Sequence, residues 1–519
     1  MLIIQIAWFW HAIIEDAFIS FRYAYHWAAG RGLTLNPGEA VEGYSNFLWT
    51  LAIGLGMRLG GEPAALARWL GLAAMLALLG VIFWAARRWA GVEAAALALT
   101  LAGSSTALAF WATAGLETIL YALWTALALG LYLAAAEPAG AVRPGWQAQR
   151  YALFLALAAL TRPEGLGLAL LLILLEARRG GPRPALRAAL LCALPYAVFL
   201  LWRWQTYGAL LPNSLLAKAG LGQALASEPA RFFMLSLAYA GNWALKWGLP
   251  VWLLLIWPAR GHAAARPLLL TIAYTGLVAL VGAGDWMPLQ RLWLAALPPF
   301  IWLAVIGWQR QPRRGLAALL IAILILLQWD LPALRQVSRD TRPLDRWWQT
   351  QMQHVRDAAG EEALPMATTV LGRTGYYLRD LPLLDAFGLA DSHIAREGAP
   401  ALRLGRTDWA YTLAQAPAFI LINDPQPGLR RRMATAGSYQ WLDLPAPPDF
   451  AVALFVRQDL AGAAATAFAA TLRPADDPAI DVQFADLFSR RQRAALGPLY
   501  SFCDPATSLC QPLWHLLKP

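Results

Sequence analysis

Long apolar segments dominate the sequence, and their length decides what the chain can fold into. A helix needs about 20 apolar residues to cross the hydrocarbon core of a bilayer. Hydrophobic residues make up 59% of the chain and charged residues only 14%, which is more apolar material than a soluble core uses. We therefore expect an α-helical polytopic membrane protein. Its apolar segments run at 64–86, 92–111, 118–136, 188–205, 234–258, 267–283, 292–309 and 315–329.

Interrupted stretches complete the predicted set of spans. Stretch 151–177 is broken at Thr161–Gly165, where Pro and Gly interrupt a helix and two ions need partners, so we expect two short helices meeting at one membrane face. The apolar residues Met1–Ile14 are too short for a full span, so either this helix continues past Glu15 or the native N-terminus is incomplete. Together these segments predict about eleven transmembrane helices. Ser45–Gly60 carries Arg58 and is assigned to a juxtamembrane helix on the outer face.

Arginines in alternate loops predict the topology. The net charge of +10 suggests nucleic acid, but the arginines are spread over short loops, so we expect no nucleic-acid partner. The positive-inside rule places these loops in the cytoplasm and the C-terminus outside, in the inner (cytoplasmic) membrane of a bacterium. The loops contain Arg87/Arg88, Arg143/Arg150, Arg178/Arg179/Arg183/Arg187, Arg260/Arg266 and Arg310/Arg313/Arg314.

The composition changes near Asp330. Polar residues and proline rise, and apolar runs shorten to strand length, as in Ala418–Ile422. We expect a transmembrane domain at 1–330 and an extracytoplasmic soluble α/β domain at 331–519. Cys503 and Cys510 flank a short loop, and they are expected to pair as a disulfide if that domain lies in an oxidising compartment.

Ionisable residues then gather on the predicted outer face. Carboxylates and cations together suit an enzyme that deprotonates a hydroxyl and stabilises a departing phosphate. The strongest stretch is Glu15–Tyr23, where a helix would put Glu15 and Arg22 on one stripe and Asp16, Ser20 and Tyr23 on its neighbour. A helix end capped by acids and an arginine is the alternative reading of this stretch.

Several motifs resemble the GT-C glycosyltransferases. They look most like the branch that contains the mycobacterial terminal β-(1→2)-arabinofuranosyltransferase. The resemblance extends to about residue 400. It rests on Glu15–Arg22, Gly30–Glu39, Val41–Trp49, Ala114–Glu117, Thr161–Gly165, Leu211–Ser214 with Lys218, Gly284–Pro288 with Arg291, and Asp385–Arg396.

The resemblance implies a GT-C-like fold and a polyprenyl-phosphate-linked sugar donor that enters from the bilayer. It also implies that an acidic residue of the first outer loop activates the acceptor. This role falls to Asp16, with Glu15 as the rival because related families often have Asp before Glu. The candidates for holding the phosphate are Arg22, Arg162, Lys218 and Arg291, since cations pair strongly with it in a partly dehydrated site. The alternative for each of these four cations is a structural role at the outer membrane face without any ligand.

Further polar residues are candidates for contact with sugar or acceptor. Glu117 and Asp285 would position sugar hydroxyls or pair with the cations, and Tyr44, Asn46 and Asn213 would meet the sugar or serve only the lipid–water boundary. We expect no metal site and no cofactor, because the six histidines are scattered, although some GT-C enzymes use a divalent cation. No nucleotide-binding motif is present, which favours a lipid-linked donor.

The sequence thus predicts a membrane glycosyltransferase. It would move a pentose, plausibly D-arabinofuranose, from a polyprenyl-phosphate carrier to an extracytoplasmic glycan, glycolipid or protein. An inverting enzyme would use Asp16 as general base, whereas the net retention implied by the resembled branch would make Asp16 a nucleophile or a stabiliser of positive charge. The alternative is a transporter or flippase of a lipid-linked sugar, which also uses intramembrane ions and broken helices.

Overall fold

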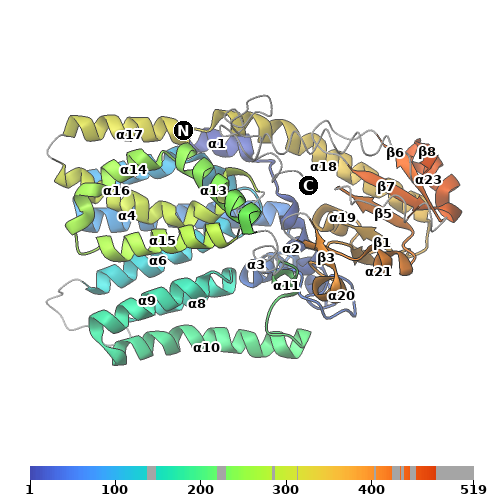
Figure 1. Cartoon of the computed structure of the whole chain (residues 1–519), viewed down its shortest axis with the longest axis horizontal. Helices are drawn as coiled ribbons and strands as arrows, with labels where there is room; N and C mark the ends of the chain where they lie inside the picture. Colours follow the sequence, from blue (N-terminus) through green and yellow to red (C-terminus); the bar gives the residue numbers. More distant parts are fainter. Residues whose placement is uncertain are drawn as a thin grey trace.

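A computed structural model shows a long helical bundle with a smaller α/β part at one end (Figure 1). The longest helices of the bundle lie roughly side by side, and the strands gather beyond one set of helix ends. The structure describes residues 1–136, 148–218, 229–282, 287–311, 314–401, 405–423, 433, 438–444 and 452–474.

The helical class predicted from the apolar segments is confirmed. Within the described part of the chain, four apolar helices are long enough to cross a membrane, namely α4 (Pro63–Ser104), α6 (Thr118–Ala136), α10 (Pro182–Tyr207) and the continuous run Pro288–Arg310 from η2 through α16. The count of about eleven spans stays a prediction. The bundle contains α1 (Leu2–Phe9), α2 (Glu15–Ala28), α3 (Phe47–Arg58), α4 (Pro63–Ser104), α5 (Thr106–Trp111), α6 (Thr118–Ala136), α8 (Tyr151–Thr161), α9 (Gly165–Gly180), α10 (Pro182–Tyr207), α11 (Asn213–Lys218), α13 (Pro229–Lys246), α14 (Leu249–Ile256), η1 (Trp257–Gly261), α15 (Ala265–Val281), η2 (Pro288–Ala296), α16 (Leu297–Arg310) and α17 (Arg314–Gln328).

Several predicted segments are broken where the local sequence allows it. Stretch 151–177 forms α8 and α9 with the break at Thr161–Gly165, as expected. Segment 92–111 is interrupted at Ser105, whose hydroxyl accepts the Leu108 N–H at 3.3 Å and begins α5. Segment 234–258 is interrupted at Gly248, which adopts a left-handed conformation (φ 67°) before α14. At the N-terminus α1 ends at Phe9 and α2 is a separate helix, so the first helix does not continue past Glu15.

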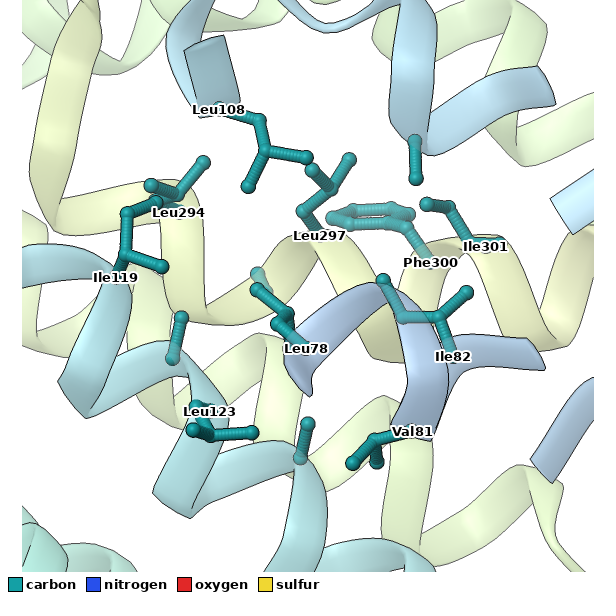
Figure 2. Packing of buried hydrophobic residues seen from close by; sticks show 14 of the residues in the cluster. Leu78, Val81, Ile82, Leu108, Ile119, Leu123, Leu294, Leu297, Phe300 and Ile301 are labelled. Carbon is teal, nitrogen blue, oxygen red and sulfur yellow. The ribbon is translucent and has the colours of Figure 1, made fainter. Parts of the chain in front are cut away.

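Small residues let the helices of the bundle approach closely. Figure 2 shows Leu78 and Ile82 of α4 meeting Phe300 and Ile301 of α16 in the interior, with α5, α6 and η2 contributing neighbours. A Cβ on Gly307 of α16 would lie only 2.0 Å from the Leu255 carbonyl oxygen, so this contact between backbones requires glycine. Close approach at small residues is typical of helix packing inside membranes, where dispersion contacts replace the hydrophobic effect.

Helix α10 turns an apolar face outward. Leu190, Leu194 and Val198 follow one another at helical spacing, and their exposed fractions are 60%, 69% and 63%. A continuous apolar face of this kind is unfavourable in water and is explained by contact with lipid. The polytopic class therefore rests on the exposed faces as well as on the segment lengths.

Arginine-bearing turns gather at one end of the bundle. Arg179, at the turn between α9 and α10, donates to the Tyr132 carbonyl near the end of α6 at 3.2 Å. Gln309, at the end of α16, bonds to the Ala90 carbonyl close to the kink of α4 at Gly91. In Figure 1 the α9–α10 and α16–α17 turns lie at the end opposite the strands. This segregation supports the predicted topology, although the orientation in the membrane itself stays a prediction.

The α/β part follows the long helix α18 (Leu331–Ala359). Its six-stranded mixed sheet has the order β2-β1-β5-β7-β6-β8. Strand β1 pairs in parallel with β2 and β5, while the β5–β7, β7–β6 and β6–β8 pairs are antiparallel. The predicted strand at Ala418–Ile422 is β5. The elements are β1 (Met366–Thr368), α19 (Leu371–Tyr377), β2 (Leu383–Asp385), α20 (Ser392–Glu397), β3 (Ala399–Ala401), β4 (Gly405–Thr407), α21 (Trp409–Ala414), β5 (Phe419–Ile422), β6 (Tyr439–Asp443), β7 (Ala453–Arg457), η3 (Gln458–Leu460), α23 (Ala461–Phe468) and β8 (Thr471–Pro474).

Candidate active site

Arg162 lies at the centre of an ionic cluster in the break between α8 and α9. Its Nη1 contacts Glu117 Oε1 at 2.7 Å, and its Nη2 and Nε contact the two carboxylate oxygens of Glu164 at 2.7 and 3.3 Å. The side chain of Glu117 is only 5% exposed and that of Arg162 12%. Ions this deeply buried are stable only when they are paired and hydrogen-bonded. This requirement explains why the helix breaks at the position of Arg162 and Glu164.

The cluster continues toward the first outer helix. Asn46, directly before α3, donates from Nδ2 to Glu117 Oε2 at 2.8 Å. Its Oδ1 accepts the hydroxyls of Ser20 on α2 at 3.1 Å and Thr50 on α3 at 3.0 Å. Ser20, Asn46, Glu117, Arg162 and Glu164 thus form one chain of contacts, which we call the polar cluster. Sequence analysis singled out Asn46, Glu117 and Arg162, and the structure brings all three into it.

Asp16 occupies the first turn of α2, one helical turn before Ser20, and is half-buried. The neighbouring backbone is fixed to the loop that carries Glu117, because the Ile14 N–H donates to the Ala114 carbonyl at 3.0 Å. Gly115 of that loop has a left-handed φ of 89°, and a Cβ there would lie 3.0 Å from that of Ala17. The start of α2 and the Glu117 loop are therefore in direct contact.

A narrow pocket lies beside Arg162. Arg162 and Glu164 form part of its wall, and Arg291 of η2 lies in the same wall, so two of the predicted phosphate-binding cations share one cavity. Two residues that precede Arg291 adopt left-handed backbone conformations, Leu289 with φ 58° and Gln290 with φ 44°. Strained backbone at non-glycine residues is found most often where a site requires one particular geometry. The remaining lining residues are Thr118, Tyr121, Tyr274, Thr275, Val278, Leu292 and Ala295.

A second, wider and more apolar pocket lies beside the same helix break. Pro163, which separates Arg162 from Glu164, lines it together with Phe47, Tyr196 and Phe199. Arg203 at its wall forms an ion pair with Glu42, with Nε 2.7 Å from Oε2. Burial raises the pKa of the Glu42 carboxyl to about 7, although Arg203 opposes the shift.

Glu15 and Arg22 hold the α/β part onto the bundle. The predicted stripe exists, since both residues lie on α2, but it faces α19. Glu15 accepts the Arg373 backbone N–H at 3.0 Å in the first turn of α19, and Arg22 donates to the Gly375 and Leu378 carbonyls at its other end. An acid at the N-terminus and a base at the C-terminus complement the unpaired groups and the dipole of a helix.

The surroundings of Arg22 leave no place for a phosphate. Its guanidinium is fully buried and its five N–H groups meet five acceptors, which are the carbonyls of Leu35, Gly375, Leu378 and Leu381 and the side-chain oxygen of Asn36. Burial lowers the pKa of Arg22 to about 10, so the group stays charged at neutral pH. Our interpretation of Arg22 as a phosphate ligand does not fit this geometry, because every donor is already used.

Tyr44 and Asn213 also lie between the bundle and the α/β part. The Asn213 amide donates to the carbonyls of Gly388, Leu389 and Asp391 at 3.0–3.1 Å. Tyr44 is 3% exposed, packs on Tyr23, and shares a hydrogen bond of 3.1 Å with Tyr207. Both side chains are committed to this docking interface, so the structure does not bring them to the cavity near Arg162.

The remaining predicted residues lie outside the described part of the chain. Asp285, Cys503 and Cys510 fall in ranges that are not described, and for Lys218 only the backbone of α11 is described. Among the described residues, no three His, Cys, Asp or Glu side chains lie close enough together to hold a metal ion.

Known proteins resemble the chain in sequence and in fold. The terminal β-(1→2)-arabinofuranosyltransferase of Mycobacterium tuberculosis is 30% identical over 272 residues, which are 50% of this chain and 43% of that protein. The crystal structure of ArnT from Cupriavidus metallidurans bound to undecaprenyl phosphate matches with a TM-score of 0.55 at 14% identity, covering 88% of this chain and 97% of ArnT. Its apo form matches with a TM-score of 0.53 at 13% identity, covering 87% and 96%. The resemblance to the mycobacterial arabinofuranosyltransferase is confirmed over half of the chain, and ArnT shares the fold.

These matches differ in how much of the chain they cover and in what they show. The aligned part spans less than half the length of the mycobacterial relative, and the identity to ArnT is low enough that it bears on the fold alone. Residues 339–470, most of the α/β part, match a family described as a domain of unknown function, DUF8728.

Some residues of the site were missed or undervalued from sequence. From sequence Glu164 was only part of the Thr161–Gly165 break, yet it binds Arg162 through both carboxylate oxygens. Its position two residues after Arg162 across a proline was the available signal. No local sequence pattern pointed to Arg373, because its partner Glu15 is 358 residues away in the chain.

Proposed function

We propose that the chain is a membrane glycosyltransferase that moves a sugar from a polyprenyl-phosphate carrier to an acceptor hydroxyl. One observation carries the proposal: carboxylates and arginines converge on a pocket at the helix ends nearest the α/β part, within the fold of ArnT. The arginines of this pocket meet one requirement of the reaction, cations for the departing phosphate. The acidic start of α2, which contacts the Glu117 loop, offers the other, a base for the hydroxyl.

Asp16 is our candidate for the carboxylate that acts on the acceptor. The rival Glu15 is held by the backbone and side chain of Arg373, and burial raises the pKa of its carboxyl. Asp16 stands instead on the stripe of α2 that carries Ser20 and leads into the polar cluster. In the inverting form of the reaction, Asp16 takes the proton of the acceptor hydroxyl. That oxygen then bonds to the anomeric carbon as the bond to the carrier phosphate breaks.

Arg162 and Arg291 are our candidates for stabilising the phosphate as it leaves. They approach one cavity from α8–α9 and η2, and a guanidinium matches phosphate oxygens in charge and geometry. Glu117 and Glu164 orient Arg162, and Asn46 orients Glu117. The apolar pocket beside Pro163 suits an isoprenoid chain, because its lining is largely aromatic and aliphatic.

The sugar we propose is D-arabinofuranose, and the acceptor an extracytoplasmic glycan, glycolipid or protein. The similarity to the mycobacterial arabinofuranosyltransferase supports the sugar. The collection of arginine-bearing turns at the end opposite the strands supports an inner-membrane protein with its α/β part outside the cell. Neither comparison supports the transporter alternative.

The test is transfer of label by the purified full-length chain in lipid nanodiscs. The donor is radiolabelled polyprenyl-phospho-arabinose, with a matched mannose donor as control and a panel of arabinan, glycolipid and glycoprotein acceptors. We expect a labelled product from the arabinose donor that is lost in Asp16→Asn. The anomeric configuration of the product then separates inversion from retention. Transfer from the mannose donor alone would refute the sugar, and carrier movement across the bilayer without any product would refute the enzyme.

A further inference from the structure

The α/β part contacts two residues just before the proposed catalytic aspartate, Ile13 and Glu15, through a single residue, Arg373. Its Nη2 donates to the Ile13 carbonyl at 2.8 Å, and its Nη1 contacts Glu15 Oε2 at 3.3 Å. Its backbone N–H also donates to both Glu15 oxygens at 3.0 and 3.2 Å. The residues anchored in this way begin three positions before Asp16 and end immediately before it.

Arg373 itself is firmly held. Its Nε donates to Asp345 of α18 at 2.8 Å, its guanidinium carbon lies 5.0 Å from the ring centre of Phe18, and its side chain is only 5% exposed. Nearby Asp345 and Glu15 raise the pKa of Arg373 against the effect of burial, so the cation is fully charged. A guanidinium bonded to two carboxylates is held in one orientation. The groups that it contacts, the Ile13 carbonyl and the Glu15 carboxylate, are therefore held in place as well.

Steric contact reinforces these hydrogen bonds. A Cβ on Gly372 would lie 2.1 Å from the Glu15 carbonyl oxygen and 2.7 Å from its Oε1. The N-terminus of α19 therefore rests directly on the N-terminus of α2, at a distance that any larger residue would increase. On the opposite side the Ile14 N–H is bonded to the Ala114 carbonyl of the Glu117 loop. The start of α2 therefore contacts the α/β part on one side and the Glu117 loop on the other.

We infer that Arg373 is a positioning residue for the transfer reaction, which fixes the Asp16 carboxylate through Ile13 and Glu15 and makes the α/β part a component of the active site. This inference rests on the proposed function, in which Asp16 acts on the acceptor. Misplacement of a catalytic group by about 1 Å costs roughly 100-fold in rate, because the reacting atoms leave their near-attack geometry. Donor binding at Arg162 and Arg291 does not depend on this contact, so kcat and KM respond differently.

The experiment compares full-length variants in the arabinose-transfer assay. We expect Arg373→Ala to lower kcat by about 10- to 100-fold while KM for the lipid donor stays within twofold of wild type. Arg373→Lys should recover part of kcat, since an ammonium still reaches one of the acceptors. The matched control is Arg356→Ala, which removes an arginine that bonds the Tyr377 carbonyl at the far end of α19 and should leave kcat unchanged.

Glu15→Gln and Gly372→Ala keep the inference testable if Arg373→Ala does not fold. Both variants retain the buried arginine and its bond to Asp345, and each should lower kcat several-fold at constant KM. The inference is overturned if the three folded variants, Glu15→Gln, Gly372→Ala and Arg373→Lys, all keep the kcat of wild type. The same holds if KM rises in proportion as kcat falls.

Asp16→Asn, assayed beside them, separates the two proposals. If Asp16→Asn is inactive and the Arg373 and Glu15 variants are normal, only the positioning role fails. If Asp16→Asn keeps wild-type kcat, the proposed function of Asp16 fails whatever the other variants do.

Discussion

Arg22 and Arg162 stand in similar sequence contexts and have opposite surroundings. Arg22 follows the acids Glu15 and Asp16, Arg162 precedes Glu164 by two positions, and both arginine side chains are largely buried. Arg22 is surrounded by four backbone carbonyls and one amide oxygen, which use all its donors. Arg162 is held by two carboxylates and forms part of a cavity wall. The partner, rather than the burial, distinguishes a structural anchor from a candidate ligand-binding cation.

The difference defines two regions that meet on helix α2. One stripe of the helix, with Glu15 and Arg22, docks the α/β part through α19. The neighbouring stripe, with Ser20, leads into the polar cluster and the cavity. We expect residues of the polar cluster and the cavity to affect turnover most, and residues that dock the α/β part to affect stability most.

The largest effect is expected at Asp16. Asp16→Asn removes the proposed proton acceptor with almost no change in volume, so kcat for sugar transfer should fall by about 10²- to 10⁴-fold. The thermal unfolding midpoint in detergent should stay near that of wild type. Comparable losses in Asp16→Asn and Glu15→Gln would mean that the two stripes do not differ in function.

The next largest effect is expected at Arg162. Arg162→Ala leaves Glu117 and Glu164 buried without their cation, which costs about 3–5 kcal/mol for a buried pair. Transfer should fall by at least about 100-fold, because the cavity also loses a proposed phosphate ligand. The double variant Arg162→Gln with Glu117→Gln is the control, since it removes the stranded charge at Glu117. It should regain stability but not turnover, and recovery of both would assign Arg162 to structure alone.

Arg22 should affect stability more than chemistry. Arg22→Ala takes a donor from five acceptors, of which the Leu378 carbonyl and Asn36 Oδ1 keep backbone N–H partners. The carbonyls of Leu35, Gly375 and Leu381 lose their bond to Arg22, each worth about 1–3 kcal/mol before the site relaxes or admits water. We expect a lower unfolding midpoint and faster proteolysis of the α/β part, with turnover per folded molecule reduced only about tenfold, as expected for an indirect effect on positioning. A loss of turnover equal to that of Arg162→Ala, in folded protein, would contradict the comparison.

The smallest effect is a pH dependence of stability from Glu42, which pairs with Arg203 beside the second pocket. Its folded-state pKa is about 7, above the ordinary 4.5, so the folded chain binds this proton more tightly than the unfolded chain. The resulting stability is present below about pH 4.5 and is lost as the pH rises through about 7. Between pH 5 and pH 8, wild type should lose about 1–3 kcal/mol relative to Glu42→Gln, whose side chain cannot ionise. Parallel unfolding curves for the two proteins across this range would exclude the effect.

The sequence predicted the elements of the fold better than the partners of its ions. Apolar length and periodicity identified the helices of the bundle, and a Pro-Glu-Gly break correctly separated α8 from α9. Burial patterns of this kind are local and can be read from neighbouring residues. The breaks at Ser105 and Gly248 were missed, because one residue inside an apolar run carries little weight in such a pattern.

The site was predictable only in part, for a physical reason. Asn46 and Glu117 were predicted as sugar or acceptor contacts and Arg162 as a phosphate ligand, and the structure links all three directly. Arg22 was assigned to phosphate because a guanidinium in sequence looks the same whether carbonyls or ligands will surround it. Three of its four carbonyl partners come from residues 375–381, more than 350 positions away, so no local pattern records them.

The most direct measurement is the stabilisation of the folded chain by undecaprenyl phosphate, because it needs no acceptor. A ligand at 100 times its Kd stabilises the folded state by about 2.7 kcal/mol. Thermal unfolding of wild type, Arg291→Gln and Arg356→Ala would be followed in detergent over a range of lipid concentrations. We predict stabilisation of wild type and Arg356→Ala and an affinity at least about tenfold weaker in Arg291→Gln. Equal stabilisation of all three would contradict a carrier site between Arg162 and Arg291.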